Sequence, residues 1–337
     1  MFIEMGSVEH FETAVLVVNL GSPDEPTPSA LRRYLREFLS DPRVIDLPRW
    51  QWLPILHGIV LTFRPRKSAH AYEQVWTEEG SPLIVITEQQ TEALQKALWA
   101  RGKRVLVDYA MRYGNPSIES VLKRLHEKGV KRLLVIPMYP QYSCSTTASI
   151  VDGVADALKK QRLIPELRFI RDWYNHSKYH KALARTIRED IEQYGEVDKV
   201  LFSYHGVPKR YVETGDPYQE QCEMTTKYVA RLMNWREEEY QTIFQSRFGS
   251  EEWLQPYADK TIEALPKQGV KRVAVICPGF SADCLETLEE MAEENKALFF
   301  ENGGEEYRYI PALNAQTDHI ELLADLAENH LWQSALP

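Results

Sequence analysis

The sequence predicts an α/β protein built from two similar doubly wound, Rossmann-like domains, each with a mainly four-stranded parallel sheet flanked by helices. Three observations support this prediction. Short apolar runs alternate with helical patterns along the 337 residues. The runs are apolar throughout rather than at every second residue, as in strands that are buried on both faces of a parallel sheet. Segments of the first half also recur, in the same order, in the second half.

The apolar runs define the predicted strands. In the first half the runs lie at 14–19, 104–110, 132–138 and 167–170. In the second half they lie at 199–204, 240–246, 272–277 and 307–310. Helical patterns fill the intervals, as in the segment that begins at Ser117, a good N-cap, and stops at Gly129.

The internal repeat predicts two domains, at residues 1–175 and 176–337, with the last helix packing back on the first domain. The repeated pairs are AVLVVNLGSP (14–23) with KVLFSYHGVP (199–208), AMRYG (110–114) with QSRFG (245–249), and GVKRLLVIPMYP (129–140) with GVKRVAVICPGF (269–280). The first pair sets Leu20 against His205. The same strand end therefore carries an apolar residue in one half and a histidine in the other.

Composition excludes several classes of protein. Hydrophobic residues make up 44% and charged residues 26%, which is typical of a globular protein. A net charge of −9 argues against a nucleic-acid partner. No apolar run approaches the roughly 20 residues that span a bilayer, and no basic segment precedes the first apolar stretch, as a signal peptide would require. Four cysteines without C-x-x-C spacing suit reduced thiols in the cytoplasm.

Two features lie near the predicted carboxyl ends of strands, where doubly wound sheets bind ligands. His205 ends one strand and suits a base or a metal ligand, because imidazole titrates near neutral pH; a structural histidine that caps a turn is the alternative. Glu286, Glu290 and Glu294 follow another strand with helical spacing and so line one helix face. They form either an ordinary solvated face or a row that carries protons or divalent cations.

The segment 47–67, LPRWQWLPILHGIVLTFRPRK, has helical spacing and is apolar on nearly every side. Such a helix is either buried or in contact with lipid. Its tryptophans and the trailing Arg64, Arg66 and Lys67 favour a lip at the membrane surface, with a core helix as the alternative. The basic side chains suit anionic headgroups or carboxylates.

Aromatic residues gather in or beside the strand-end loops. Tyr113, Tyr139, Trp253 and Phe280 suit the wall of a site for a large flat apolar ligand, although ordinary packing explains any one of them. The nucleotide fingerprints G-x-x-x-x-G-K-[ST] and G-x-G-x-x-G are absent, as is the nucleophile motif G-x-S-x-G. Nucleotide binding and α/β-hydrolase chemistry are therefore unsupported.

With these features in place, the chain resembles the ferrochelatases, enzymes that insert ferrous iron into protoporphyrin. The resemblance extends from about Ala14 to about Leu323 and rests on specific segments. They are VNLGSP (18–23), YPQYSCSTT (139–147), SYHGVP (203–208), GDPY (215–218), FQSRFGSEEWLQP (244–256) and PGFSADCLETLEE (278–290). It implies a chelatase-like pair of Rossmann-like domains around a porphyrin cleft, in agreement with the repeat.

The resemblance also implies roles for individual residues. His205 corresponds to the family's active-site histidine, held to accept a pyrrole proton, to bind the incoming metal, or both. Glu286 corresponds to its partner carboxylate, and Glu290 and Glu294 to the rest of the acidic row along which metal binds. Phe280 joins the porphyrin-binding candidates through its place in a strand-end loop. The candidates that match the family's pocket positions are Leu20, Arg64, Arg112, Tyr113, Tyr139, Trp253 and Asp283.

Expectations about ligands follow from the same resemblance. The expected substrates are Fe²⁺ and protoporphyrin IX, because Leu20 is apolar and the lip carries tryptophans; coproporphyrin III is the alternative. Cys144 matches one ligand of the [2Fe–2S] cluster that some ferrochelatases carry, but no cysteine follows Cys284, so we expect no cluster and no tightly bound cofactor. A cobalt or nickel chelatase and a non-catalytic haem carrier are the competing functions. We expect a cytoplasmic monomer or homodimer with a peripheral membrane contact through 47–67.

Overall fold

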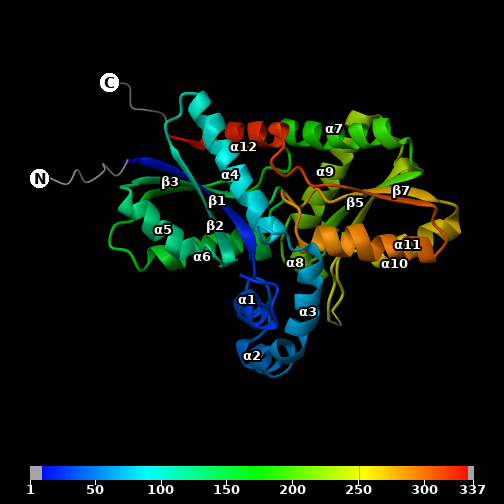
Figure 1. Cartoon of the computed structure of the whole chain (residues 1–337), viewed down its shortest axis with the longest axis horizontal. Helices are drawn as coiled ribbons and strands as arrows, with labels where there is room; N and C mark the ends of the chain where they lie inside the picture. The colour runs from blue at the N-terminus through cyan, green and yellow to red at the C-terminus, as the bar shows by residue number, and fades with distance from the viewer. Residues whose placement is uncertain (1–9, 250, 333–337) are drawn as a thin grey trace, which may run out of the picture.

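The computed structural model describes residues 10–249 and 251–332 and contains two four-stranded sheets, which confirms the predicted fold class (Figure 1). The first sheet has the order β2-β1-β3-β4, with β1 (Thr13–Ser22), β2 (Leu106–Gly114), β3 (Arg132–Pro137) and β4 (Glu166–Phe169). The second has the order β6-β5-β7-β8, with β5 (Lys199–His205), β6 (Tyr240–Gln245), β7 (Arg272–Ile276) and β8 (Glu306–Ile310).

The two sheets share their register as well as their strand order. All strand pairs are parallel. Val17 of β1 lies opposite Ile136 of β3, and Phe202 of β5 lies opposite Ile276 of β7. These are equivalent positions in the repeated segments, so the internal repeat of the sequence corresponds to a repeat of strand pairing.

Helices cover both faces of each sheet. On the first sheet, α4 (Pro82–Ala100) lies on one face, and α5 (Ile118–Glu127) and α6 (Ser149–Leu158) lie on the other. As predicted, α5 is capped by Ser117, whose hydroxyl accepts the N–H of Ser120. The second sheet lies between α7 and α9 on one face and α10 and α11 on the other. These helices are α7 (Ser177–Tyr194), α9 (Tyr218–Met233), α10 (Ala258–Ala264) and α11 (Asn295–Glu301).

One hydrophobic core runs between the sheets. It contains Val17 and Leu94 from the first half and Phe202 and Leu323 from the second. The last helix, α12 (Thr317–His330), packs against both α4 and α7 (Figure 1). Four further short helical segments connect these elements: the π-helix η2 (Cys144–Ala148), the α-helix α8 (Lys209–Glu213), and the 3-10 helices η3 (Glu237–Glu239) and η4 (Leu265–Gln268). The division of the chain at residue 175 stays a prediction.

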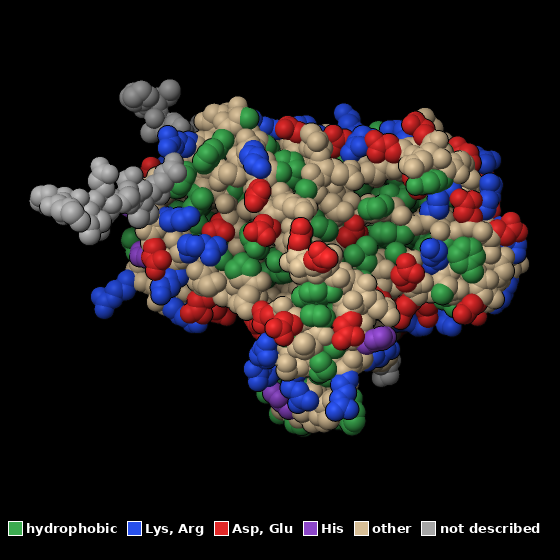
Figure 2. Space-filling view, viewed as in Figure 1, with side chains coloured by type: hydrophobic (Ala, Val, Ile, Leu, Met, Phe, Trp, Pro, Cys, Tyr) green, Lys and Arg blue, Asp and Glu red, His purple; other side chains and the backbone are tan. Residues whose placement is uncertain are grey.

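A lobe projects from one edge of the molecule below the carboxyl end of β1 (Figure 1). The lip segment 47–67 lies in this lobe and is helical, but a π-helical turn interrupts it. Trp52 is buried, whereas Trp50, Ile59 and Phe63 are 76%, 58% and 72% exposed. Figure 2 shows Lys and Arg side chains gathered on the same lobe. Its elements are α1 (Pro28–Ser40), α2 (Arg49–Ile55), η1 (Leu56–Val60) and α3 (Leu61–Val75).

The helices of the structure include none, over residues 10–249 and 251–332, that is both long and apolar enough to cross a membrane.

A buried histidine in α12 should make the stability of the fold depend on pH. His319 is fully buried, its ring lies tilted against that of Trp173, and its Nδ1 lies 2.7 Å from the carbonyl oxygen of Asn314; burial lowers its pKa to about 4. In the unfolded chain the same imidazole has a pKa of about 6.5, so it binds a proton more readily there than in the folded protein. Stability is therefore lost as the pH falls from about 6.5 towards 4. We expect a loss of about 2 kcal/mol between about pH 7.5 and pH 5.

Urea unfolding at the two pH values checks this expectation. The variant His319→Gln should show a smaller pH dependence than the unmodified protein. The matched control is His126→Gln, since His126 is exposed on α5. Equal pH dependence in all three proteins would show that His319 does not contribute to it.

Candidate active site

The carboxyl ends of the two sheets meet where β1 and β3 adjoin the loop after β7. Leu20 of β1 packs in one apolar cluster with Phe280 and Cys284. The hydroxyl of Ser281 donates to the carbonyl oxygen of Met138, at the end of β3, at 2.8 Å. We call this region, defined by these five residues, the junction.

His205 is the last residue of β5, so the strand delivers its side chain to this edge. Its Nδ1 lies 2.6 Å from the carbonyl oxygen of Gly206. A carbonyl oxygen only accepts, so Nδ1 carries the proton and Nε2 presents a free lone pair. Position 206 has no room for a side chain, because a Cβ there would lie 2.9 Å from the carbonyl oxygen of Gln245 and 3.2 Å from the Trp253 ring. The local packing therefore fixes the turn that follows His205.

The acidic row lies on η5 (Glu286–Glu294), which is a π-helix rather than an ordinary α-helix. Hydrogen bonds in a π-helix run from residue i to i+5, so residues five apart are drawn together. Glu286 and Glu290 are half-buried and Glu294 is exposed. The sequence analysis missed Glu289; burial and the neighbouring Glu294 raise the pKa of Glu289 to about 7. Its closeness to Glu294 depends on the π geometry, which residue spacing did not indicate.

Gln245 and Ser246, at the end of β6, fix this helix to the strand that carries His205. Gln245 is buried and lies opposite His205 across the β5–β6 pair. Its amide Nε2 donates to the carbonyl oxygen of Glu286 at 2.8 Å. Ser246 donates its N–H to Glu290 Oε1 at 2.8 Å and its hydroxyl to the other carboxylate oxygen. Burial raises the pKa of Glu290, although Ser246 and His205 oppose the shift.

Three tyrosines approach Glu286. The pKa of each is raised, first by burial and also by the charge of Glu286; they are Tyr34, Tyr72 and Tyr139. Tyr139 is a predicted site residue that follows β3. Tyr34 and Tyr72 were not predicted and come from α1 and α3. The lobe therefore contributes to the surroundings of Glu286.

Two predicted site residues are linked through an aromatic side chain of the loop after β6. Trp253 is buried, and its ring centroid lies 4.8 Å from that of Phe248. The exposed Arg64 of α3 places its guanidinium carbon 5.7 Å from the Phe248 centroid. The indole Nε1 of Trp253 is buried and has no hydrogen-bond partner in the part of the chain that the structure describes. These contacts join the lobe to the second half of the molecule.

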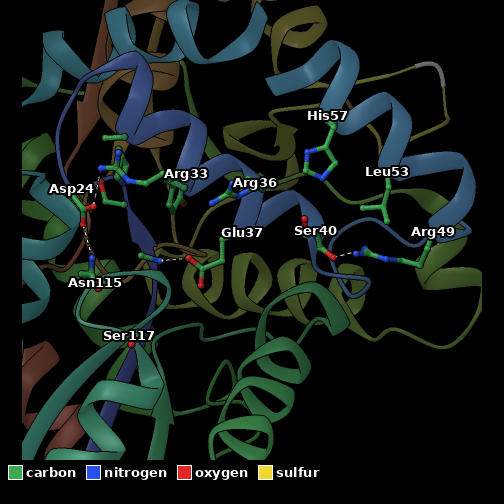
Figure 3. A pocket seen from close by; sticks show the side chains of 15 residues that line it. Asp24, Arg33, Arg36, Glu37, Ser40, Arg49, Leu53, His57, Asn115 and Ser117 are labelled. Atoms are coloured by element: carbon green, nitrogen blue, oxygen red, sulfur yellow. Dashed lines mark hydrogen bonds and ion pairs between the residues drawn. The ribbon is translucent and has the colours of Figure 1, made fainter. Parts of the chain in front are cut away.

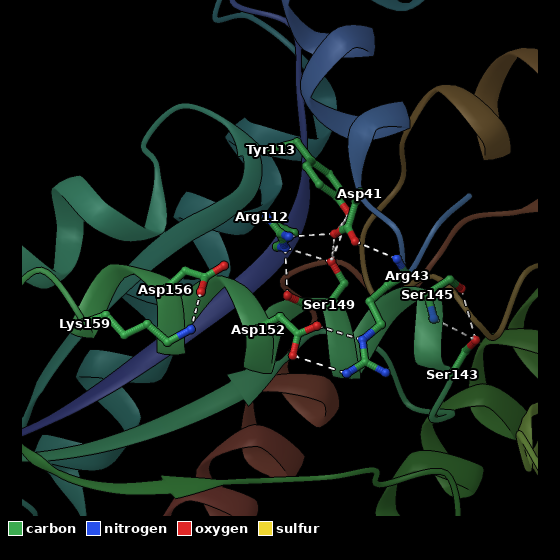
Figure 4. Close-up of polar contacts among 10 residues, drawn as sticks. All are labelled: Asp41, Arg43, Arg112, Tyr113, Ser143, Ser145, Ser149, Asp152, Asp156 and Lys159. Carbon is green, nitrogen blue, oxygen red and sulfur yellow. Dashed lines mark hydrogen bonds and ion pairs between the residues drawn. The ribbon is translucent and has the colours of Figure 1, made fainter. Parts of the chain in front are cut away.

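Arg112 and Tyr113 are engaged with a carboxylate that the sequence analysis did not single out (Figure 4). Asp41 Oδ2 accepts from the Arg112 guanidinium at 2.6 Å and from the Tyr113 hydroxyl at 2.8 Å. Ser149 also donates to it, at 2.6 Å, and accepts from Arg112 at 2.7 Å. This network ties the end of α1 to β2 and α6, so it supports the lobe.

Asp283 likewise has several partners. Its carboxylate accepts from the Tyr309 hydroxyl at 2.6 Å, from Thr287 at 3.0 Å and from Asn314 at 2.7 Å. Tyr309 belongs to β8, so Asp283 anchors the loop that leads into η5. Over residues 10–249 and 251–332, no group of three or more His, Cys, Asp or Glu side chains is arranged to hold a metal ion.

The two similar four-stranded parallel sheets, flanked by helices, have the two-domain α/β fold of the chelatases. Solved structures share this fold. SirB from Bacillus subtilis with Fe³⁺ superposes with a TM-score of 0.56 over 94% of this chain and 95% of its own, at 9% identity. CbiX, the terminal enzyme for siroheme biosynthesis in denitrifying bacteria, gives 0.52 over 95% and 100%, at 12% identity.

Sequence comparison is more specific than the fold. The ferrochelatase family model matches residues 12–331. A ferrochelatase of Idiomarina loihiensis is 52% identical over 320 residues, which are 94% of this chain and 87% of the relative. A ferrochelatase of Actinobacillus pleuropneumoniae serotype 3 is 54% identical over 314 residues, 93% and 97% of the two chains. The chain belongs to the ferrochelatase family, as the motifs predicted.

Proposed function

We propose that this enzyme inserts Fe²⁺ into protoporphyrin IX to give haem b, the last step of haem biosynthesis, and is thus a lyase that forms nitrogen–metal bonds. The hydrogen bond between His205 Nδ1 and Gly206 carries the proposal. It leaves Nε2 as an acceptor at the edge where the acidic helix begins. A free-base porphyrin loses two N–H protons as the metal enters, so a base must stand within hydrogen-bond reach of the ring.

The carboxylates of η5 suit both the metal and the released protons. Fe²⁺ accepts imidazole and carboxylate ligands, and we assign its reception to His205 and Glu286. Glu290 and Glu294 continue the row away from the junction. The pKa of Glu290 is raised by burial, so this carboxylate binds a proton more readily than an exposed one. The row therefore offers proton acceptors next to the site where protons are released.

Protoporphyrin IX, with fewer carboxylates than coproporphyrin III, suits the chemistry of the junction. Leu20 and Phe280 supply apolar walls, to which we add Tyr139 and Trp253 as porphyrin contacts. Asp41 and Ser149 engage the guanidinium of Arg112, and Asn314 and its neighbours engage Asp283. We therefore assign both Arg112 and Asp283 to the support of the pocket, with Tyr113. Arg64 is the basic side chain we propose for a propionate.

An anaerobic insertion assay tests the proposal. Fe²⁺ is mixed with either porphyrin, and the loss of free-base fluorescence is followed. We expect kcat/KM for protoporphyrin IX to exceed that for coproporphyrin III by about tenfold, since burying an extra carboxylate without a partner costs on the order of 1–3 kcal/mol. The reverse preference would assign coproporphyrin III as the substrate. Tight haem binding without turnover would indicate a carrier. Turnover only with Co²⁺ or Ni²⁺ would indicate a different chelatase.

We further propose that the enzyme works without a resident [2Fe–2S] cluster. Cys144 is the cysteine at the matching position, and burial and the nearby Asp216 raise its pKa to about 12, which disfavours the thiolate that such clusters require. Cys222, Cys277 and Cys284 are buried. Acid-labile sulfide in haem-free, anaerobically purified protein would refute this proposal.

We propose that the protein is cytoplasmic and contacts the inner face of the membrane through the lip. Trp50 and Phe63 are exposed and apolar, and Arg66 and Lys67 lie near them on α3. Removing one large apolar side chain from a lipid contact should weaken binding about tenfold, because burying it is worth roughly 1.5–3 kcal/mol. In co-sedimentation with anionic vesicles, we therefore expect Trp50→Ser to reduce the bound fraction.

The matched control is Leu163→Ser, since Leu163 is 64% exposed on a loop outside the lobe. This variant should bind vesicles like the unmodified protein. Equal losses in both variants, or no binding by any of the three proteins, would exclude the lip as the membrane contact.

A further inference from the structure

A cavity of about 770 Å³ lies on the lobe, between α1, the α2–η1 helices and the loop after β2 (Figure 3). Its lining includes none of His205, Glu286 or Glu290. The volume is within the range of small-molecule sites. The charged and titratable residues that line it are Asp24, Arg33, Tyr34, Arg36, Glu37, Arg49 and His57.

The two carboxylates of the cavity already have partners. Asp24 Oδ1 accepts from the Asn115 amide at 2.8 Å, and its other oxygen lies 3.4 Å from Arg33 Nη2. Glu37 Oε2 accepts the N–H of Gly114 at 3.0 Å. Both carboxylates are thus held to the loop after β2.

Of the basic side chains on the α1, α2 and η1 side of the cavity, those of Arg36, Arg49 and His57 form no ion pair within residues 10–249 and 251–332. Arg49 donates to the carbonyl oxygen of Ser40 and makes no ion pair in residues 10–249 and 251–332. Within those residues, the side chains of Arg36 and His57 make neither a hydrogen bond nor an ion pair. Figure 3 shows Arg36 and Ser40 on α1, His57 above them and Arg49 reaching towards Ser40. Two guanidinium groups and one imidazole therefore border the same space.

This arrangement matches a phosphate group. A guanidinium donates in a fixed fork that fits phosphate oxygens, and charge-assisted hydrogen bonds of this kind are the strong ones. Three donors from separate helices suit the several oxygens of a phosphate better than the single edge of a carboxylate. The lining carries three arginines against two carboxylates, in a chain whose net charge is −9.

We propose that this cavity binds a phosphate group, either as free phosphate or as a phospholipid headgroup. The second source is compatible with the surroundings, because Trp50 follows Arg49 directly and is 76% exposed, and Ile59 of η1 is 58% exposed. Acyl chains could lie against these side chains while the headgroup enters the cavity. The proposal concerns a site separate from the metal-insertion chemistry and does not depend on it.

Calorimetric titration without porphyrin or iron tests the site. The probes are inorganic phosphate and dihexanoyl phosphatidylglycerol below its micelle concentration, at constant ionic strength. We expect saturable binding that Arg36→Gln weakens about tenfold or more, the usual cost of removing a hydrogen bond to a charged group. The matched control is Arg32→Gln, since Arg32 is exposed on the same helix and does not line the cavity. This control should bind like the unmodified protein.

The outcomes separate the two sources and the alternatives. Tighter binding of the short-chain lipid than of phosphate would identify a headgroup site. Equal affinity for the two probes would identify a site for free phosphate. No saturable binding of either probe, or the same loss in Arg32→Gln as in Arg36→Gln, would overturn the proposal. His57→Gln provides a second variant on the opposite wall and should also weaken binding. Unchanged metal insertion in Arg36→Gln would show that the defect belongs to this cavity alone.

Discussion

Replacement of His205 by alanine is expected to lower kcat for iron insertion by about 10²–10⁴-fold, the usual contribution of a positioned general base. The hydrogen bond to Gly206 directs the Nε2 lone pair outward, and no other described imidazole lies at the end of β5. Without this acceptor, a pyrrole proton must leave to water or to a carboxylate of η5. Porphyrin binding should change little, since apolar and aromatic side chains supply the proposed walls.

The experiment separates a chemical role from a structural one. Porphyrin affinity is measured by fluorescence quenching, and turnover is measured with and without added imidazole. Partial recovery of turnover by imidazole in His205→Ala would indicate a missing base. His126→Ala, on the exposed face of α5, is the control for loss of a histidine. Normal turnover in His205→Ala would exclude the residue from the reaction.

The features that sequence reasoning located are those that depend on local pattern. The continuous apolar runs predicted the eight strands of the two sheets. The internal repeat predicted that the two halves share a fold, and the two sheets have the same strand order. His205 could be found because it interrupts an apolar strand end and has an apolar counterpart in Leu20. Each of these inferences uses neighbours within a few residues or a repeated segment, which the chain displays directly.

The missed features depend on contacts between distant segments or on an unusual backbone. Asp41 meets Arg112 across 71 positions of sequence, and nothing near it marks a buried carboxylate. Tyr34 and Tyr72 approach Glu286 only because the lobe folds back on the junction. Glu289 faces Glu294 because η5 is a π-helix, which 3.6-residue periodicity does not anticipate. The cavity likewise forms between segments that are separate in sequence.

Asp41 also supports the second large expected effect, a loss of about 3–5 kcal/mol in the free energy of unfolding on its replacement by alanine. Its side chain is 3% exposed and that of Arg112 is 18% exposed, so water solvates neither charge well. Removal of Asp41 would leave Arg112 without its counter-charge, and the hydroxyls of Tyr113 and Ser149, 2.9 Å apart, would lose the carboxylate that both contact. The N–H of Arg43, which Asp41 Oδ1 also accepts at 2.7 Å, would lose its partner too.

A neighbouring ion pair provides the comparison that isolates burial as the cause. Arg43 and Asp152 form a salt bridge at 2.7 Å, but both side chains are more than two-fifths exposed. Asp152→Ala should therefore cost at most about 1 kcal/mol, the usual value of a surface pair. Urea unfolding of Asp41→Ala, Arg112→Ala, Asp152→Ala and the double variant Asp41→Ala/Arg112→Ala makes the test. If the uncompensated guanidinium is the main cost, the double variant should be less destabilised than the sum of its two single changes. A loss of stability in Asp41→Ala no larger than that in Asp152→Ala would contradict the role assigned to the network.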